Sequence, residues 1–246
     1  MRKHAIVAIT LGFIAVNFHL AFAQKSVSES RVTIKSEDWN LIGDLRIPKS
    51  KKSLPVVLML NKADGDRKVY EELAGELSKK GIASLRLDLR GHGESINLGK
   101  FIPNKEERSS MIWDAERDVI AAHQYLKNHP KLDSTKIGII GGSYSGEEMA
   151  EAGRLSGYAQ AYVALSPGSF SDESIAGIDQ SNVPWLFIAS NNERYLKEIT
   201  AEVQAKSQTV ELIILPGPHH ATRILSNYKG ISERIALWIS QRLSSK

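Results

Sequence analysis

The feature that most constrains the fold of this chain is a series of short apolar segments separated by stretches with helical periodicity. The segments read PVVLML, IASLRLDL, KIGII, QAYVAL, PWLFIA and VELIIL. Short, largely uninterrupted apolar runs are typical of strands that are covered on both faces. Their alternation with helices predicts an α/β fold with one mostly parallel sheet and helices on both faces.

The segment before the first of these apolar runs has a different pattern. Residues 31–48 alternate between apolar and polar on both sides of a polar turn at 36–40. This period of two predicts an antiparallel hairpin. The sheet is therefore expected to carry an antiparallel edge.

Helices are predicted between the apolar segments from their periodicity and end signals. We expect them over 66–80, 110–128, 147–155 and 231–243. Asp66 is the predicted N-cap of the first, and Gly81 its C-terminal stop. The last is expected to direct Ile235, Leu237, Trp238 and Leu243 toward the core.

Residues 1–23 have the pattern of a signal peptide. Basic residues precede an apolar run from Ala5 to Ala21, and Ala21-Phe22-Ala23 fits a cleavage site. The alternative is an uncleaved membrane anchor, since the run is about as long as a short spanning helix. The polar Asn17 and His19 favour cleavage, which predicts a secreted or periplasmic protein without stable membrane insertion.

The remainder, residues 27–246, is expected to form a single domain. It contains no internal repeat or linker, and the segment between Ser166 and Val183 is too short for a cap domain. Removal of the signal peptide leaves 30 of the 32 basic residues against 28 acidic ones, so the formal charge falls from +4 to +2. This small excess does not predict a nucleic-acid partner. The absence of cysteine excludes disulfides and thiolate metal sites.

The turn GGSYSG, which follows the segment KIGII, contains two candidate nucleophiles. A tight strand-to-helix turn requires small residues beside its apex. Around Ser143 the flanking residues are small, whereas Ser145 at the apex would place Glu147 two residues later. That carboxylate would lie near a developing oxyanion, where its charge has the wrong sign. Ser143 is therefore the predicted nucleophile.

Together, LDLRGHGES, GGSYSG and the order of strands and helices resemble the α/β-hydrolase family, in particular its small, lidless dienelactone-hydrolase-like and acyl-peptidase-like members. The resemblance covers essentially the whole mature chain. It implies an α/β-hydrolase fold and a catalytic triad in the chain order serine, acid, histidine.

The resemblance assigns the other two triad members to loops after later strands. The loop PGPHH places the catalytic histidine at His220, with His219 as its neighbour. The acid is expected at Glu193, although aspartate is commoner there. Asp172 and Asp179 are the alternative acids.

The resemblance also implies an oxyanion hole. One N–H would come from Tyr144, which follows the nucleophile, and the other from Ala63 in the sequence NKA. Lys62 stands where the family often has glycine. Either this loop takes another path, because a position with positive φ would strain lysine, or the Lys62 side chain enters the site and favours an anionic substrate or intermediate.

The remaining motifs do not point to a cofactor. His92 is interpreted as a structural loop residue and His123 as a surface or core residue. No metal-binding or nucleotide-binding motif is present, so neither a metal nor a cofactor is expected. These observations predict an exported serine hydrolase that acts on a small acyl substrate. The alternatives are a peptidase or acyltransferase with the same triad, and a non-catalytic binding protein on the same fold. The sequence does not specify an oligomeric state.

Overall fold

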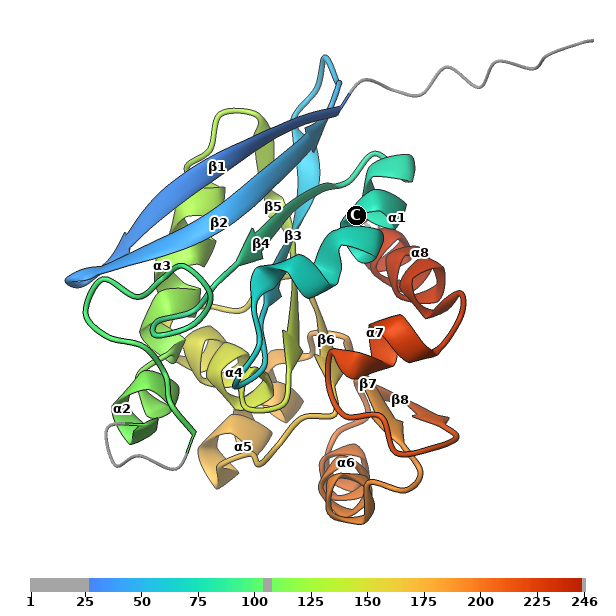
Figure 1. Cartoon of the computed structure of the whole chain (residues 1–246). Helices are drawn as coiled ribbons and strands as arrows, with labels where there is room; N and C mark the ends of the chain where they lie inside the picture. Colours follow the sequence, from blue (N-terminus) through green and yellow to red (C-terminus); the bar gives the residue numbers. More distant parts are fainter. Residues whose placement is uncertain (1–26, 104–107, 245–246) are drawn as a thin grey trace, which may run out of the picture.

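The computed structural model describes residues 27–103 and 108–244, and its centre is one eight-stranded sheet. The strands are β1 (Val27–Ser36), β2 (Trp39–Pro48), β3 (Leu54–Leu60), β4 (Ala83–Leu87), β5 (Leu132–Gly142), β6 (Ala161–Leu165), β7 (Trp185–Ser190) and β8 (Val210–Leu215). Their order in the sheet is β1-β2-β4-β3-β5-β6-β7-β8 (Figure 1). β1 and β2 form an antiparallel hairpin, β2 pairs antiparallel with β4, and all other neighbours are parallel. The mostly parallel sheet and its antiparallel edge are confirmed.

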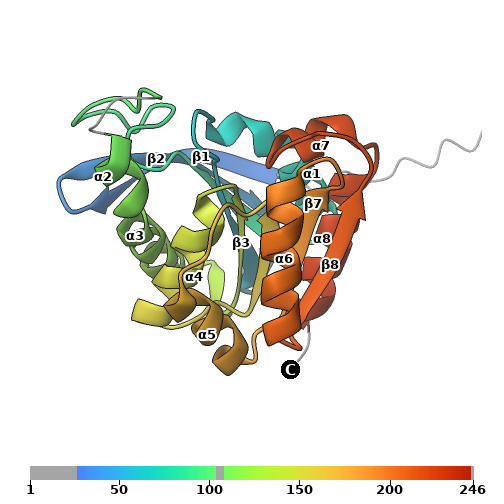
Figure 2. The same cartoon turned by 90° about the horizontal axis from the view of Figure 1, so that it is seen from below.

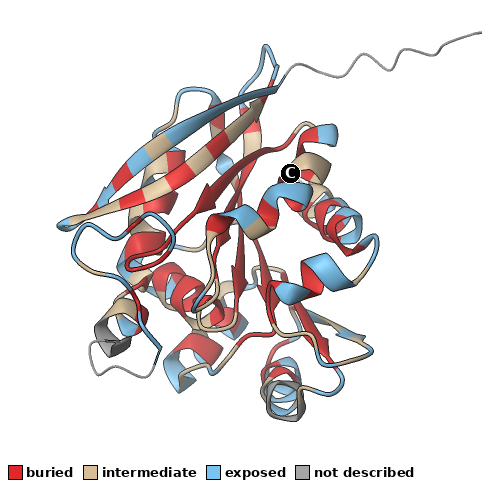
Figure 3. Cartoon of the chain, viewed as in Figure 1, coloured by how far each residue is buried: buried red, intermediate tan, exposed pale blue. Residues whose placement is uncertain are grey.

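Helices cover both faces of this sheet (Figure 2). They are η1 (Arg67–Tyr70), α1 (Glu71–Lys79), α2 (Arg108–Trp113), α3 (Glu116–Lys127), α4 (Ser145–Ser156), α5 (Asp172–Ser181), α6 (Arg194–Lys206), α7 (Arg223–Asn227) and α8 (Ile231–Ser244). One core cluster joins α3, α4, α5 and α6 to the sheet, and the other joins α1, α7 and α8 to its opposite face. The central strands are buried along almost their whole length (Figure 3), as their apolar sequences predict.

Two predicted helices are interrupted. The segment predicted at 66–80 begins as the 3₁₀ turn η1, which Asp66 caps by accepting a hydrogen bond from the Lys68 N–H at 2.8 Å, and continues as α1. The segment predicted at 110–128 breaks into α2 and α3 at Asp114 and Ala115. The predicted apolar face of α3 is nevertheless buried.

One prediction for α8 is wrong. Ile235, Trp238 and Leu243 are buried, but Leu237 is 48% exposed. Two residues along a helix correspond to about 200°, so Leu237 lies on the side opposite Ile235. Leu237 therefore does not belong to the core.

The predicted signal peptide lies outside the described residues. Within 27–103 and 108–244, no helix is both long and apolar enough to cross a membrane. Between Ser166 and Val183 the chain forms the single helix α5.

The loop after β4 is held by buried ion pairs. The Arg90 guanidinium donates to Asp118 Oδ1 through Nε at 3.0 Å and through a terminal nitrogen at 2.7 Å, and the Arg90 N–H donates to Asp118 Oδ2. Both side chains are almost completely buried. In the same loop Asp88 accepts from Arg67. The charged residues of the motif LDLRGHGES thus fix the path of the loop.

We predict that Arg90→Met destabilises the protein by about 3–5 kcal/mol, because it leaves the buried Asp118 carboxylate without its counter-ion. Urea unfolding followed by circular dichroism measures the effect. The control is Arg117→Met, which removes an exposed ion pair to Glu37 and should leave the free energy of unfolding close to that of the wild type. Equal losses in the two variants would contradict this account.

Candidate active site

The turn between β5 and α4 holds Ser143 in the left-handed region, with φ +58°. A residue with a Cβ adopts this conformation only when surrounding contacts impose it. Here the Ser143 N–H donates to the Leu165 carbonyl at 3.0 Å, and the Ser143 carbonyl accepts from the N–H of Gly168 at 3.2 Å. The end of β6 and the loop after it therefore fix the apex of the turn.

The two serines of this turn have different environments. The Ser145 side chain is fully buried, and its Oγ accepts from the Gly142 N–H at 2.7 Å and donates to the Gly142 carbonyl at 2.9 Å. Ser143 is partly exposed, and its Oγ makes no hydrogen bond with any described residue. The Ser145 hydroxyl is therefore committed to hydrogen bonds within the turn, while the Ser143 hydroxyl is not bonded to any described residue.

Glu193 and His220 lie together at the same edge of the sheet. Glu193 Oε1 is 2.6 Å from His220 Nδ1. The other oxygen, Oε2, accepts from Ser166 Oγ at 2.8 Å and from the Ser190 N–H at 2.9 Å. The Glu193 side chain is 9% exposed and that of His220 40%. The carboxylate is therefore held firmly, and it orients an imidazole that solvent can reach.

The loop of Glu193 is tied directly to the loop of His220. The Asn191 N–H donates to the Leu215 carbonyl at 2.8 Å, and Asn191 Oδ1 accepts from the Gly217 N–H at 2.8 Å. The Asn192 N–H donates to the Gly217 carbonyl. Both asparagines thus bind backbone groups of the loop that carries His220, and Glu193 is the carboxylate of their own loop.

The segment that follows His220 packs against the turn of Ser143. A Cβ built on Gly142 would lie 3.1 Å from Thr222 Cγ2 and 3.4 Å from Ala221 Cβ. Ala221 itself has φ +51°. No hydrogen bond joins Ser143 Oγ to His220 Nε2 among the described residues, although such contacts are often loose in unliganded enzymes. The structure thus pairs His220 with Glu193, and the segment that follows His220 packs on the turn of Ser143.

The two predicted oxyanion donors have free N–H groups. Neither the Ala63 N–H nor the Tyr144 N–H donates a hydrogen bond within the described part of the chain. The positive φ of the Ala63 loop belongs to Asp64 (+58°). Lys62 is therefore not strained, and its Nζ donates to the Ala63 carbonyl at 2.9 Å. Its side chain folds over its own loop.

The other histidines and the alternative acids lie outside this group. His92 is buried, its Nδ1 is 2.8 Å from the Arg90 carbonyl, and burial lowers its pKa. Its ring stacks on that of Tyr144, with centroids 5.9 Å apart. The two carboxylates predicted as alternative acids are exposed on α5 and form no hydrogen bond with His220; they are Asp172 and Asp179.

The ring of His219 packs on Tyr228, and its carbonyl accepts from Ser190 Oγ. His123 is buried, which lowers its pKa to about 4. Within the described ranges, no group of three or more His, Cys, Asp or Glu side chains could hold a metal ion.

Two glutamates in the first turn of α4 carry unusual pKa values. Burial raises the pKa of Glu148 to about 9, with a further contribution from the nearby Glu116. Burial also raises the pKa of Glu147, which accepts hydrogen bonds from Ser171 and Ser174. Glu148 is thus protonated at neutral pH and adds no negative charge to this helix end, whose dipole favours an anion.

Comparison with solved structures finds similar folds over most of the chain. A dienelactone hydrolase from Anabaena variabilis matches 88% of this chain and 96% of its own, with a TM-score of 0.65 and 20% sequence identity. An acetyl xylan esterase from Paenibacillus sp. matches 90% of this chain and 86% of its own, with a TM-score of 0.70 and 14% identity. This chain has the α/β-hydrolase fold.

Sequence relatives of this chain are distant. A Bradyrhizobium protein described as a probable 2-oxo-3-(5-oxofuran-2-ylidene)propanoate lactonase is 22% identical over 81% of this chain and 86% of its own length. No family model matches the chain.

Sequence reasoning missed the two serines that hold the carboxylate of Glu193. Ser190 is the last residue of β7, and Ser166 directly follows β6 with φ +43°. The only signal was their position. Ser166 lies at the carboxyl end of β6 and Ser190 at that of β7, and these two strands are neighbours in the sheet. In an α/β-hydrolase fold this edge carries the functional loops.

We predict that Glu148→Gln changes how stability depends on pH. A carboxyl whose pKa is raised in the folded state stabilises the protein below its unfolded pKa, and this contribution is lost as pH rises toward 9. The variant should be more stable than the wild type at pH 8 and lose this advantage toward pH 5, by up to about 1.4 kcal/mol per pH unit.

Urea unfolding at both pH values measures this difference. Glu151→Gln is the control, because Arg154 lowers the pKa of that carboxylate. A pH-independent difference between Glu148→Gln and the wild type would contradict the account.

Proposed function

We propose that this protein is a serine hydrolase that cleaves carboxylic esters, including lactones, through an acyl-enzyme. The observation that carries the proposal is the 2.6 Å contact between Glu193 Oε1 and His220 Nδ1, with the segment after His220 packed against the turn that holds Ser143 at φ +58°. Support comes from the hydrolases with similar folds and from the lactonase relative.

In the proposed mechanism, Ser143 Oγ attacks the ester carbonyl carbon and transfers its proton to His220 Nε2. Glu193 holds the proton on Nδ1 and stabilises the imidazolium that forms. The N–H groups of Ala63 and Tyr144 stabilise the tetrahedral oxyanion. His220 then protonates the leaving alkoxide. Water, activated by His220, releases the acid from Ser143.

Lys62 is proposed to favour substrates that carry a carboxylate. Its ammonium group is bound to the carbonyl of Ala63, the proposed oxyanion donor, so a positive charge lies beside the site. The substrate named for the Bradyrhizobium relative combines a lactone ring with a carboxylate.

We also propose that the protein is exported, with residues 1–23 as the signal peptide, to the periplasm or the medium. No cofactor, metal or nucleic acid takes part in this proposal. The substrate is a small acyl compound, because no cap domain lies over the site within residues 27–103 and 108–244. A peptidase or an acyltransferase would use the same three residues, and product analysis with added amine or alcohol distinguishes them.

We predict that a fluorophosphonate probe labels the wild type and Ser145→Ala but not Ser143→Ala. Labelling requires an activated hydroxyl, and the Ser145 hydroxyl is committed to Gly142. Gel fluorescence and peptide mass spectrometry identify the labelled serine. Labelling lost only in Ser145→Ala would identify Ser145 as the nucleophile. If the wild type neither reacts with the probe nor hydrolyses p-nitrophenyl esters of any acyl length, the result would favour the alternative of a non-catalytic binding protein on the same fold.

We predict that Glu193→Gln lowers kcat on p-nitrophenyl acetate by about 10²–10⁴-fold, because the amide no longer fixes the imidazole tautomer. His220→Ala should lose at least as much activity. The matched controls Asp172→Asn and Asp179→Asn should retain wild-type kcat, since both carboxylates are exposed on α5. A large loss in either control, with Glu193→Gln active, would reassign the acid.

A further inference from the structure

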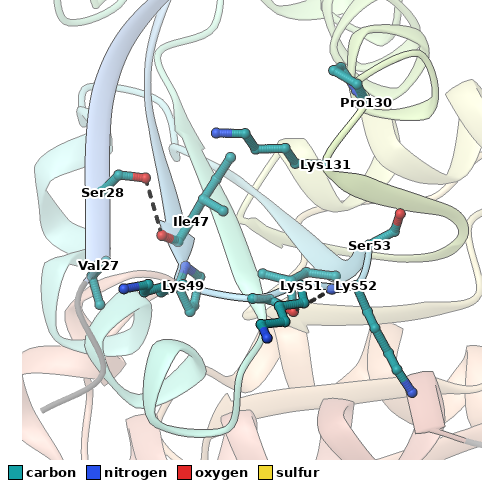
Figure 4. Close-up of a pocket in the computed structure, with 12 residues that line it drawn as sticks. Val27, Ser28, Ile47, Lys49, Lys51, Lys52, Ser53, Pro130 and Lys131 are labelled. Carbon is teal, nitrogen blue, oxygen red and sulfur yellow. Dashed lines mark hydrogen bonds between the residues drawn. The ribbon is translucent and has the colours of Figure 1, made fainter. Parts of the chain in front are cut away.

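A second feature lies at the opposite edge of the sheet from the candidate active site. A hollow of about 460 Å³ opens where β1 begins, β2 ends and β3 begins, and the loop before β5 closes it (Figure 4). Four lysines line it: Lys49, Lys51, Lys52 and Lys131. None of the proposed catalytic residues takes part in it.

The charge of this hollow is uncompensated. No aspartate or glutamate is among its lining residues, and none of the four lysines forms an ion pair with a described residue. This distinguishes them from the basic residues of the neighbouring strands, since Arg46 and Arg86 both pair with Glu29 and Glu71. All four lysines are exposed. A cluster of unpaired ammonium groups attracts an anionic partner.

The arrangement of the lysines indicates the form of that partner. In Figure 4 the side chains of Lys49, Lys52 and Lys131 point apart and do not converge on one point. A small anion needs converging donors, whereas an extended anionic surface satisfies ammonium groups that are spread over a face. The hollow therefore fits a surface of many phosphates better than one bound ion.

The position of Val27 indicates which anionic surface the hollow faces. Val27, the first described residue, lines the hollow. Residues 22–26 alone separate it from the apolar run that ends at Ala21, and five residues reach no more than about 18 Å when extended. Before cleavage, a bilayer that holds the apolar run therefore lies within this reach of Val27, one of the residues that line the hollow.

We propose that the hollow formed by Lys49, Lys51, Lys52 and Lys131 docks on a membrane surface rich in anionic phospholipid headgroups. Each lysine near such a surface contributes favourably, and salt screens the attraction. Because the hollow lies at the start of β3 and Ser143 follows the end of the parallel strand β5, docking turns the proposed active site away from the lipid. The docked enzyme acts on water-soluble esters.

The test uses the full chain as a bacterial cell produces and processes it, with its N-terminus identified by mass spectrometry. Binding is measured by co-sedimentation with vesicles of phosphatidylcholine alone and of phosphatidylcholine mixed with phosphatidylglycerol. The readout is the increase in binding caused by the anionic lipid, because a retained apolar segment inserts into both kinds of vesicle.

We expect anionic lipid to strengthen binding by at least about tenfold at low salt, and high salt to abolish the increase. Replacing the four lysines of the hollow by glutamine should remove the increase in binding that anionic lipid causes. The matched control replaces Lys35, Lys68, Lys80 and Lys127, which lie outside the hollow, and should retain it. Equal losses in both fourfold variants would show a non-specific charge effect and overturn the proposal.

A free anion as the ligand is tested separately. Inorganic phosphate, added at constant ionic strength, should not displace the protein from anionic vesicles. Displacement that needs the same lysines would assign the hollow to a small phosphate compound and overturn membrane docking. Turnover of a soluble ester by vesicle-bound protein should equal that in solution. If neither the free nor the bound protein hydrolyses the ester, the proposed hydrolase activity is contradicted, while the binding measurements still decide on docking.

Discussion

The candidate site depends on the backbone conformation of Ser143. Its φ of +58° is unfavourable for a residue with a Cβ, and hydrogen bonds from two directions impose it. The Ser143 N–H reaches the end of β6, and the Ser143 carbonyl accepts from Gly168 in the loop after β6. The pairing of β5 with β6 therefore extends into the turn, and the fold of the sheet fixes where the hydroxyl points.

A glutamate in the position where aspartate is commoner requires a different supporting structure. The longer side chain of Glu193 reaches back to Ser166 Oγ and the Ser190 N–H with one oxygen and presents the other to His220. Ser166 has φ +43°, so it shares with Ser143 a conformation imposed by its surroundings. The two serines occupy Oε2 and thereby direct Oε1, which gives the additional methylene group a fixed orientation.

Much of this arrangement could be predicted because it is encoded locally. Continuous apolar runs identified the strands, and the small residues around Ser143 identified the turn. Contacts between segments far apart in the chain could not be predicted. The packing of Thr222 on Gly142 and the hydrogen bond from Ser166 to Glu193 depend on how the strand ends meet. The left-handed conformation considered for Lys62 is adopted by Asp64, because the Gly65 N–H donates to the Lys62 carbonyl and closes a turn whose third residue is Asp64. Leu237 was misplaced because an apolar residue is not necessarily buried.

Charged groups are arranged differently at the carboxyl ends and at the amino ends of the parallel strands. At the carboxyl ends, Glu193 is paired with His220, and burial keeps Glu148 neutral. The N–H groups of Ala63 and Tyr144 donate to no described residue, and this arrangement suits an anion that forms only during a reaction. At the opposite ends of the parallel strands, the positive charges of Lys49, Lys51 and Lys52 are exposed and without an acidic partner among the described residues. Permanent exposed charges suit a permanent anionic partner, and their distance from Ser143 along the parallel strands lets docking and chemistry proceed independently.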